Sequence, residues 1–141
     1  MLLADVNVLV YAFREDAEGH AAYRKWVEEL IGADQAYGVS EQVLSGFLRV
    51  VTHPRVFDPP APIHDAILFA DGFREQPNAV LIQPGPRHWE IFRSLCRSAG
   101  ARGNLVADAY LAALAIESGC EWITVDRDYA KFPGLHWRRP F

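Results

Sequence analysis

Short apolar runs that alternate with longer stretches of helical periodicity constrain the fold of this chain more than any other feature. Such runs lie at residues 2–5, 36–39, 79–82 and 122–125, and a possible fifth lies near residues 135–137. Short apolar strands separated by helices are typical of a parallel sheet covered by helices. The pattern therefore predicts the α/β class, with a parallel sheet at the centre of the molecule.

Helical patterns fill the segments between these runs. They cover residues 19–32, 40–51, 63–74, 87–97 and 104–117, whereas residues 6–11 either extend the first strand or begin a helix. Ser40 and Asn104 are expected to cap the helices that follow them. The helix after Asn104 is apolar nearly all round, so it should be buried. Prolines mark residues 53–62 as a loop.

Length and composition point to one compartment and one domain. A chain of 141 residues, 50% of them hydrophobic, can form its own core, so we expect a single domain over residues 1–141. Cys96 and Cys120 are too few for a disulfide framework, which indicates the reducing cytoplasm. We expect neither a signal peptide nor a membrane span, since the first residues lack a basic segment and no apolar stretch approaches ~20 residues.

The acidic balance of the chain limits the ways in which it can bind a polyanion. A formal net charge of −4 argues against a protein that holds nucleic acid by bulk electrostatic attraction. Nucleic acid remains possible as a substrate, because bound cations can supply the positive charge.

Acidic side chains stand at the points where a parallel sheet binds its ligands. Asp5 and Asp126 each follow a predicted strand, Asp128 lies two residues further on, and Asp108 lies in the first turns of the long helix. Open parallel sheets bind ligands at the carboxyl ends of their strands. We therefore expect these carboxylates to lie close together.

An acid at the end of a strand usually has a structural explanation, because it can cap a helix or form a turn. Asp126 and Asp128 fit an Asx-turn. Asp108 is harder to explain in this way, because a buried carboxylate needs a partner and no Lys or Arg lies three or four residues from it on the helix.

Convergence of these acids would require a cation. Two like charges ~4 Å apart cost about 4 kcal/mol at an effective dielectric constant near 20, so several carboxylates would not all stay ionised alone. Oxygen ligands without nearby His or Cys favour Mg²⁺ or Mn²⁺ over Zn²⁺. Such an ion can activate water for attack on phosphorus. The residues thus predict metal-assisted hydrolysis of phosphodiesters.

Three sequence motifs carry a resemblance to a known family. They are residues 5–9 (DVNVL), 103–109 (GNLVADA) and 124–128 (TVDRD), supported by residues 47–52, 54–57 and 132–137. Their order and spacing resemble the PIN domain and, more narrowly, the VapC-type ribonuclease toxins of type II toxin–antitoxin pairs. The resemblance covers nearly the whole chain.

The resemblance implies a fold, an activity and partners. The fold is a three-layer α/β/α PIN-like nuclease domain with a central parallel sheet of about five strands. The activity is that of a Mg²⁺- or Mn²⁺-dependent endoribonuclease that cleaves RNA by metal-activated water. The partners are the RNA substrate, a cognate antitoxin protein that blocks the site, and a second copy in a homodimer.

The resemblance also assigns roles to particular residues. Asp5, Asp108 and Asp126 match the metal ligands, and Asp128 is a further catalytic candidate. Asn7 matches a polar position that orients the carboxylate of Asp5, as groups behind metal ligands commonly do.

One position departs from the family pattern. Many members carry a Glu on the helix after the second strand, and that place falls near Gly46 here. Glu41 is the nearby acid, but it lies five residues earlier and also fits a first-turn acid that complements the helix dipole. Without a Glu at this place, three acids and water molecules would surround one ion.

Two other functions remain open from the sequence. A catalytically degenerate PIN-like module that binds RNA or protein would explain the missing Glu. A phosphatase with an aspartyl nucleophile would explain Asp5, but it would need an acid where Asn7 stands and a Lys ahead of the later acids, where none lies.

Overall fold

A five-stranded parallel sheet forms the centre of the computed structural model, which describes residues 1–141. Its strand order is β3-β2-β1-β4-β5. The bounds are Leu2–Ala4 for β1, Tyr37–Val39 for β2, Ala79–Leu81 for β3, Glu121–Ile123 for β4 and Trp137–Arg138 for β5. All pairs of neighbouring strands are parallel. The predicted α/β class and the sheet of five strands are confirmed.

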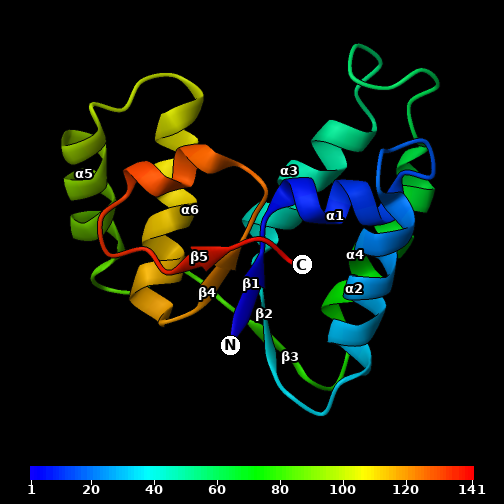
Figure 1. Ribbon diagram of the computed structural model, residues 1–141, viewed down its shortest axis with the longest axis horizontal. Coiled ribbons are helices and arrows are strands. Elements are labelled where there is room, and N and C mark those ends of the chain that lie inside the picture. Colours follow the sequence, from blue (N-terminus) through cyan, green and yellow to red (C-terminus); the bar gives the residue numbers. More distant parts are fainter.

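Helices cover both faces of this sheet, which gives the three expected layers (Figure 1). One side carries α1 (Val6–Phe13), α2 (His20–Gly32), α3 (Glu41–Val51) and α4 (Ile63–Arg74). The other side carries α5 (His88–Ala99) and α6 (Asn104–Ser118). None of these helices has the length and apolar character needed to cross a membrane.

The structure decides the local questions that the sequence left open. Residues after Asp5 begin a helix, because the Asp5 carboxylate caps α1 by accepting a hydrogen bond from the Val6 amide. Ser40 caps α3 as predicted, with its hydroxyl accepting from the Val43 amide. The prediction for Asn104 is wrong: it is the first helical residue, and the cap position belongs to Gly103 at a φ of 59°.

The burial of α6 changes along its length. Its middle is buried, from Ala109 through the stretch Leu111 to Ala115. Its first turns are more open, and Val106 is 37% exposed. The apolar pattern therefore predicted the buried part correctly and missed the open end, which carries Asp108 and borders a cavity.

The strand order places a crevice beside β1. From β1 the chain first builds β2 and β3 on one side and then crosses to build β4 and β5 on the other. The Asp5 amide donates to the Ile123 carbonyl at 2.9 Å, which joins the carboxyl ends of β1 and β4. Ligands of open parallel sheets bind at such a reversal of strand order. The fold thus brings the end of β1 and the end of β4 to one place.

Candidate active site

A cavity of about 610 Å³ opens at the carboxyl end of β1. Asp5, Asp108 and Asp126 all line it, although they come from the end of β1, from α6 and from the residues after β4. Asn7 lines it as well. The structure therefore brings together three of the four acids that the sequence singled out, along with Asn7.

Asp5 is held by three hydrogen-bond donors and is only 4% exposed. Its Oδ1 accepts from the Val6 amide at 2.7 Å. Its Oδ2 accepts from the Asn7 amide group at 2.9 Å and from the Thr124 hydroxyl at 2.5 Å. Asn7 thus lies where it can orient the Asp5 carboxylate.

Thr124 is a site residue to which sequence reasoning gave no role. Its hydroxyl donates to Asp5 and accepts from the Asn7 side chain at 3.1 Å and from the Asp126 amide at 3.0 Å. The side chain is fully buried. The sequence signal that could have identified it is a polar residue at the end of an otherwise apolar run.

Asp108 is half-buried, and its partner comes from another element, as the sequence led us to expect. The Tyr129 hydroxyl donates to Asp108 Oδ1 at 3.5 Å, the outer limit of a hydrogen bond. Tyr129 lies in a short 3₁₀ helix, Arg127–Lys131, that the sequence did not predict. Nothing in the sequence separated this tyrosine from an ordinary core aromatic residue.

Asp126 and Asp128 form the turn that leads into this 3₁₀ helix. Asp126 Oδ1 accepts from the Asp128 amide at 2.8 Å, in the manner of an Asx-turn. Asp126 reaches the cavity, whereas Asp128 is exposed, pairs with Lys131 at 3.0 Å and is not among the lining residues. Asp126 therefore belongs to the cavity, whereas Asp128 belongs to the exposed surface beside it.

Glu41 also lies away from the cavity. It is exposed in the first turn of α3 and pairs with Arg74 of α4 at 3.1 Å. Gly46 does line the cavity, but a Cβ atom built there would lie 2.9 Å from Cγ2 of Val6. This close approach of α3 to the start of α1 leaves no room for an acidic side chain at position 46 unless Val6 moves.

Two carboxylates in the cavity, Asp5 and Asp108, resist ionisation. Burial raises the pKa of Asp5 to about 6, and the charges of Asp108 and Asp126 add to this effect, while hydrogen bonds from Thr124 and Val6 oppose it. Burial also raises the pKa of Asp108 to about 6, with further contributions from the charges of Asp126 and Asp128. Burial, followed by the charges of these acids, raises the pKa of Tyr129 far above its usual value. A bound cation would relieve the crowding of negative charge.

The donor atoms fit a hard divalent ion in their chemistry. Every candidate ligand is a carboxylate oxygen, which suits Mg²⁺ or Mn²⁺. No three Asp, Glu, His or Cys side chains are already placed to hold an ion together. The side chains of these acids would therefore have to move closer together to share one ion.

Comparison with known proteins places this fold and site in a family. The family model of the PIN domain matches residues 2–135. The chain therefore belongs to the PIN domain family.

Relatives within that family are VapC ribonucleases, which confirms the narrower resemblance. The chain is 46% identical over 140 residues to the VapC ribonuclease Mb2897 of Mycobacterium bovis, covering 99% of this chain and 95% of that protein. It is 41% identical to the ribonuclease VapC25 of Mycobacterium tuberculosis, covering 99% of both chains.

Solved structures share the fold at low sequence identity. One is VapBC2 from Rickettsia felis bound to a DNA fragment from its promoter, with a TM-score of 0.68 at 17% identity, covering 98% of this chain and 97% of that one. Another is VapBC-1 from nontypeable Haemophilus influenzae, with a TM-score of 0.67 at 14% identity, covering 99% and 97%.

Proposed function

We propose that this chain is an endoribonuclease that depends on Mg²⁺ or Mn²⁺ and acts as the toxin of a toxin–antitoxin pair. The observation that carries the proposal is the meeting of Asp5, Asp108 and Asp126 in one cavity, where burial, with the charges of neighbouring acids adding to it, raises the pKa of Asp5 and Asp108. The relatives are named ribonucleases, which supports RNA as the substrate.

The three carboxylates would hold the ion, and different contacts position Asp5 and Asp108 for this role. Asp5 is fixed by Asn7 and Thr124, so that its carboxylate keeps one orientation in the cavity. Asp108 is aimed from α6 beside the Tyr129 hydroxyl. When bound, the ion would supply the activation of water and the neutralisation of charge that phosphodiester cleavage needs.

Two acids stay outside this ligand set. Asp128 contributes negative potential at Asp108 but pairs with Lys131. Glu41 pairs with Arg74 on another surface. We therefore assign the ion three carboxylate ligands from the chain, with water molecules completing its coordination.

The partners follow from the same assignment. The neighbouring structures are VapBC proteins, which supports an antitoxin partner for this chain. We further propose that the chain forms a homodimer and acts in the cytoplasm, where its RNA substrate lies and where its two free cysteines stay reduced.

Cleavage of total cellular RNA tests the proposed function. The chain is incubated with the RNA in Mn²⁺, in Mg²⁺ and in EDTA, beside the variants Asp5→Asn and Asp128→Asn. We expect discrete fragments that need the metal, disappear with Asp5→Asn and persist with Asp128→Asn. Cleavage that survives in EDTA or in Asp5→Asn would contradict the proposal. No cleavage together with no Mn²⁺ binding would favour a degenerate PIN-like binding module.

A further inference from the structure

The cavity that holds the three acids has a second wall without any acid. Four residues of α3 line this side of the cavity: Gln42, Ser45, Gly46 and Arg49. The last three follow Gln42 by three, four and seven residues. This spacing places them on one face of the helix. Polar and basic groups therefore face the same cavity as the carboxylates.

Arg49 is the one basic side chain among the cavity's lining residues. It is exposed, and no carboxylate lies within 4.0 Å of its guanidinium group, although three carboxylates line the same cavity. Arg49 therefore forms no ion pair with a carboxylate of this chain. A planar guanidinium group suits two-point binding of a phosphate group.

Part of the cavity lining is apolar. Val56 and Phe57, from the loop of residues 53–62, line it together with Tyr11 of α1. Apolar and aromatic side chains of this kind pack against the base or sugar of a single-stranded nucleotide. The cavity thus offers carboxylates, a guanidinium group and an apolar surface within one continuous space.

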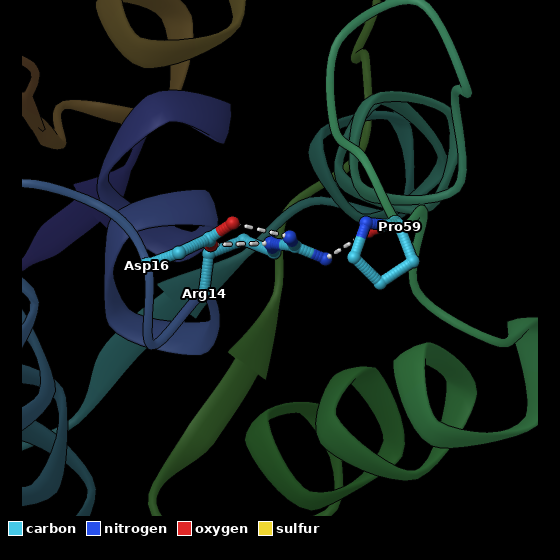
Figure 2. Close-up of polar contacts among 3 residues, drawn as sticks. All are labelled: Arg14, Asp16 and Pro59. Atoms are coloured by element: carbon cyan, nitrogen blue, oxygen red, sulfur yellow. Dashed lines mark hydrogen bonds and ion pairs between the residues drawn. The ribbon is translucent and has the colours of Figure 1, made fainter.

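The loop that supplies this apolar surface is held in place by Arg14 at the end of α1. Figure 2 shows the Arg14 side chain joined to Asp16 and to the Pro59 carbonyl, at 2.6 Å and 3.1 Å. The same guanidinium group lies 4.2 Å from the centre of the Phe57 ring. A wall that is already fixed loses little conformational entropy when a ligand packs against it.

We propose that Arg49 binds a phosphate group of the RNA strand next to the one that is cleaved. The nucleotide between these two phosphates packs against Val56 and Phe57. This inference rests on the proposed function and adds to it a substrate-binding residue outside the set of acids. Arg49 acts on substrate affinity, whereas the acids act on the ion.

The kinetics of RNA cleavage test this assignment. The probe is a labelled oligoribonucleotide that spans a cleavage site mapped in the total-RNA experiment, used in Mn²⁺ over a series of KCl concentrations. The variants are Arg49→Gln, Arg49→Lys and, as a matched control on the opposite side of the sheet, Arg93→Gln of α5.

We expect Arg49→Gln to raise KM by ~2- to 5-fold with little change in kcat, as for loss of an exposed ionic contact that acts on binding. The slope of log(kcat/KM) against log[KCl] should fall by about 0.7, the value for one phosphate contact on a single strand. Arg49→Lys should retain the slope, because it keeps the charge. Arg93→Gln should change neither quantity. Mn²⁺ affinity, measured by calorimetry, should not weaken in Arg49→Gln.

Three results would overturn the assignment in distinguishable ways. A wild-type chain that cleaves the probe while Arg49→Gln keeps its KM and salt slope would overturn the role of Arg49 alone. A wild-type chain that yields no metal-dependent fragments would overturn the proposed function, and this inference with it. Equal losses in Arg49→Gln and Arg93→Gln would show a general charge effect and would also contradict the assignment.

Discussion

The Thr124 hydroxyl donates a hydrogen bond of 2.5 Å to Oδ2 of Asp5, across 119 residues of sequence. The hydroxyl oxygen of Thr124 also accepts hydrogen bonds from the Asn7 side chain and from the Asp126 backbone amide. One hydroxyl therefore ties together the end of β1, the start of α1 and the turn that carries Asp126. The positions of two of the three acids depend on it.

Thr124→Val removes this hydroxyl while preserving the shape of the side chain. It removes the Thr124 acceptor from the Asp126 backbone amide and from the Asn7 amide group, which keeps its bond to Asp5, so we expect a loss of about 1–3 kcal/mol in the free energy of unfolding. The pKa of Asp5 should rise further above about 6, because the hydrogen bond from Thr124 lowers it. Urea unfolding and NMR titration of the Asp5 carboxyl measure the two effects.

Thr52→Val is the matched control for this variant. The Thr52 hydroxyl donates only to the Leu48 carbonyl in its own helix, so its loss should cost less than ~1 kcal/mol. Equal costs for the two variants would show that the network around Asp5 contributes nothing beyond a single hydrogen bond.

Gly46→Ala tests the close packing of α3 against the start of α1. The added Cβ atom would lie 2.9 Å from Val6. Overpacking of this kind costs ~1–3 kcal/mol, which exceeds the ~1 kcal/mol that Ala gains over Gly in a helix. We expect a net loss of stability in urea unfolding and a loss of activity, because Val6 follows Asp5 directly.

Gly72→Ala provides the opposite expectation in another helix. Nothing lies within 4 Å of a Cβ atom built at Gly72 of α4, so this variant should gain ~0.5–1 kcal/mol from helix propensity alone. If Gly46→Ala gained as much as Gly72→Ala, the proposed contact with Val6 would be refuted.

The stability of the metal-free chain should fall as the pH rises from about 4 to about 6. The folded chain holds the pKa of Asp5 and Asp108 at about 6, above the ordinary value of 3.8. Within this window the folded state binds more protons than the unfolded state, so the slope of stability against pH is negative. This loss of stability is absent at pH values below the ordinary pKa of 3.8 and complete at pH values above the raised pKa of about 6.

Urea unfolding in EDTA at pH 5 and pH 7 measures this dependence, with Asp108→Asn as the comparison. The variant lacks one of the two raised carboxyl groups, so its midpoint should change less between the two pH values than that of the wild type. Identical changes in the two proteins would contradict the assignment of a raised pKa to Asp108.

Arg14→Gln should release the loop of residues 53–62. The substitution removes the ion pair with Asp16, the hydrogen bond to the Pro59 carbonyl and the contact with Phe57. We expect a cost of about 1–3 kcal/mol. Hydrogen exchange should become faster at the amides of Val56, Phe57 and Ala61, which are bonded within the chain.

Arg24→Gln is the control for Arg14→Gln. It breaks an ion pair with Glu28 in which both side chains are more than half exposed, so its effect should stay within ~0.5 kcal/mol. Unchanged exchange in residues 55–61 of the Arg14→Gln variant would show that the loop does not depend on Arg14.

The sheet and the meeting of the acids could be predicted because both follow from local patterns. Apolar runs revealed the strands, and the ends of parallel strands must lie at one edge of the sheet. This reasoning placed Asp5 and Asp126 together, and the unexplained charge in an apolar helix added Asp108. All three line the same cavity in the structure.

The remaining features depend on contacts between distant elements. The cap of α6 is Gly103 rather than Asn104, because the backbone there turns at a positive φ that the side-chain pattern does not reveal. Arg49 lines the cavity on the same face of α3 as Gly46, where the helix comes close to Val6 of α1. Tyr129 reaches Asp108 only through the 3₁₀ helix that follows β4.

Calorimetric titration with Mn²⁺ tests most directly the claim that Asp5, Asp108 and Asp126 form a cation site. The wild-type chain should bind Mn²⁺, and below pH 6 its apparent affinity should weaken by up to about tenfold per pH unit for each carboxyl that must lose a proton. Asp108→Asn should abolish the binding, and Asp128→Asn should preserve it. Wild-type affinity retained by Asp108→Asn, or no binding by the wild-type chain at pH 7, would contradict the claim.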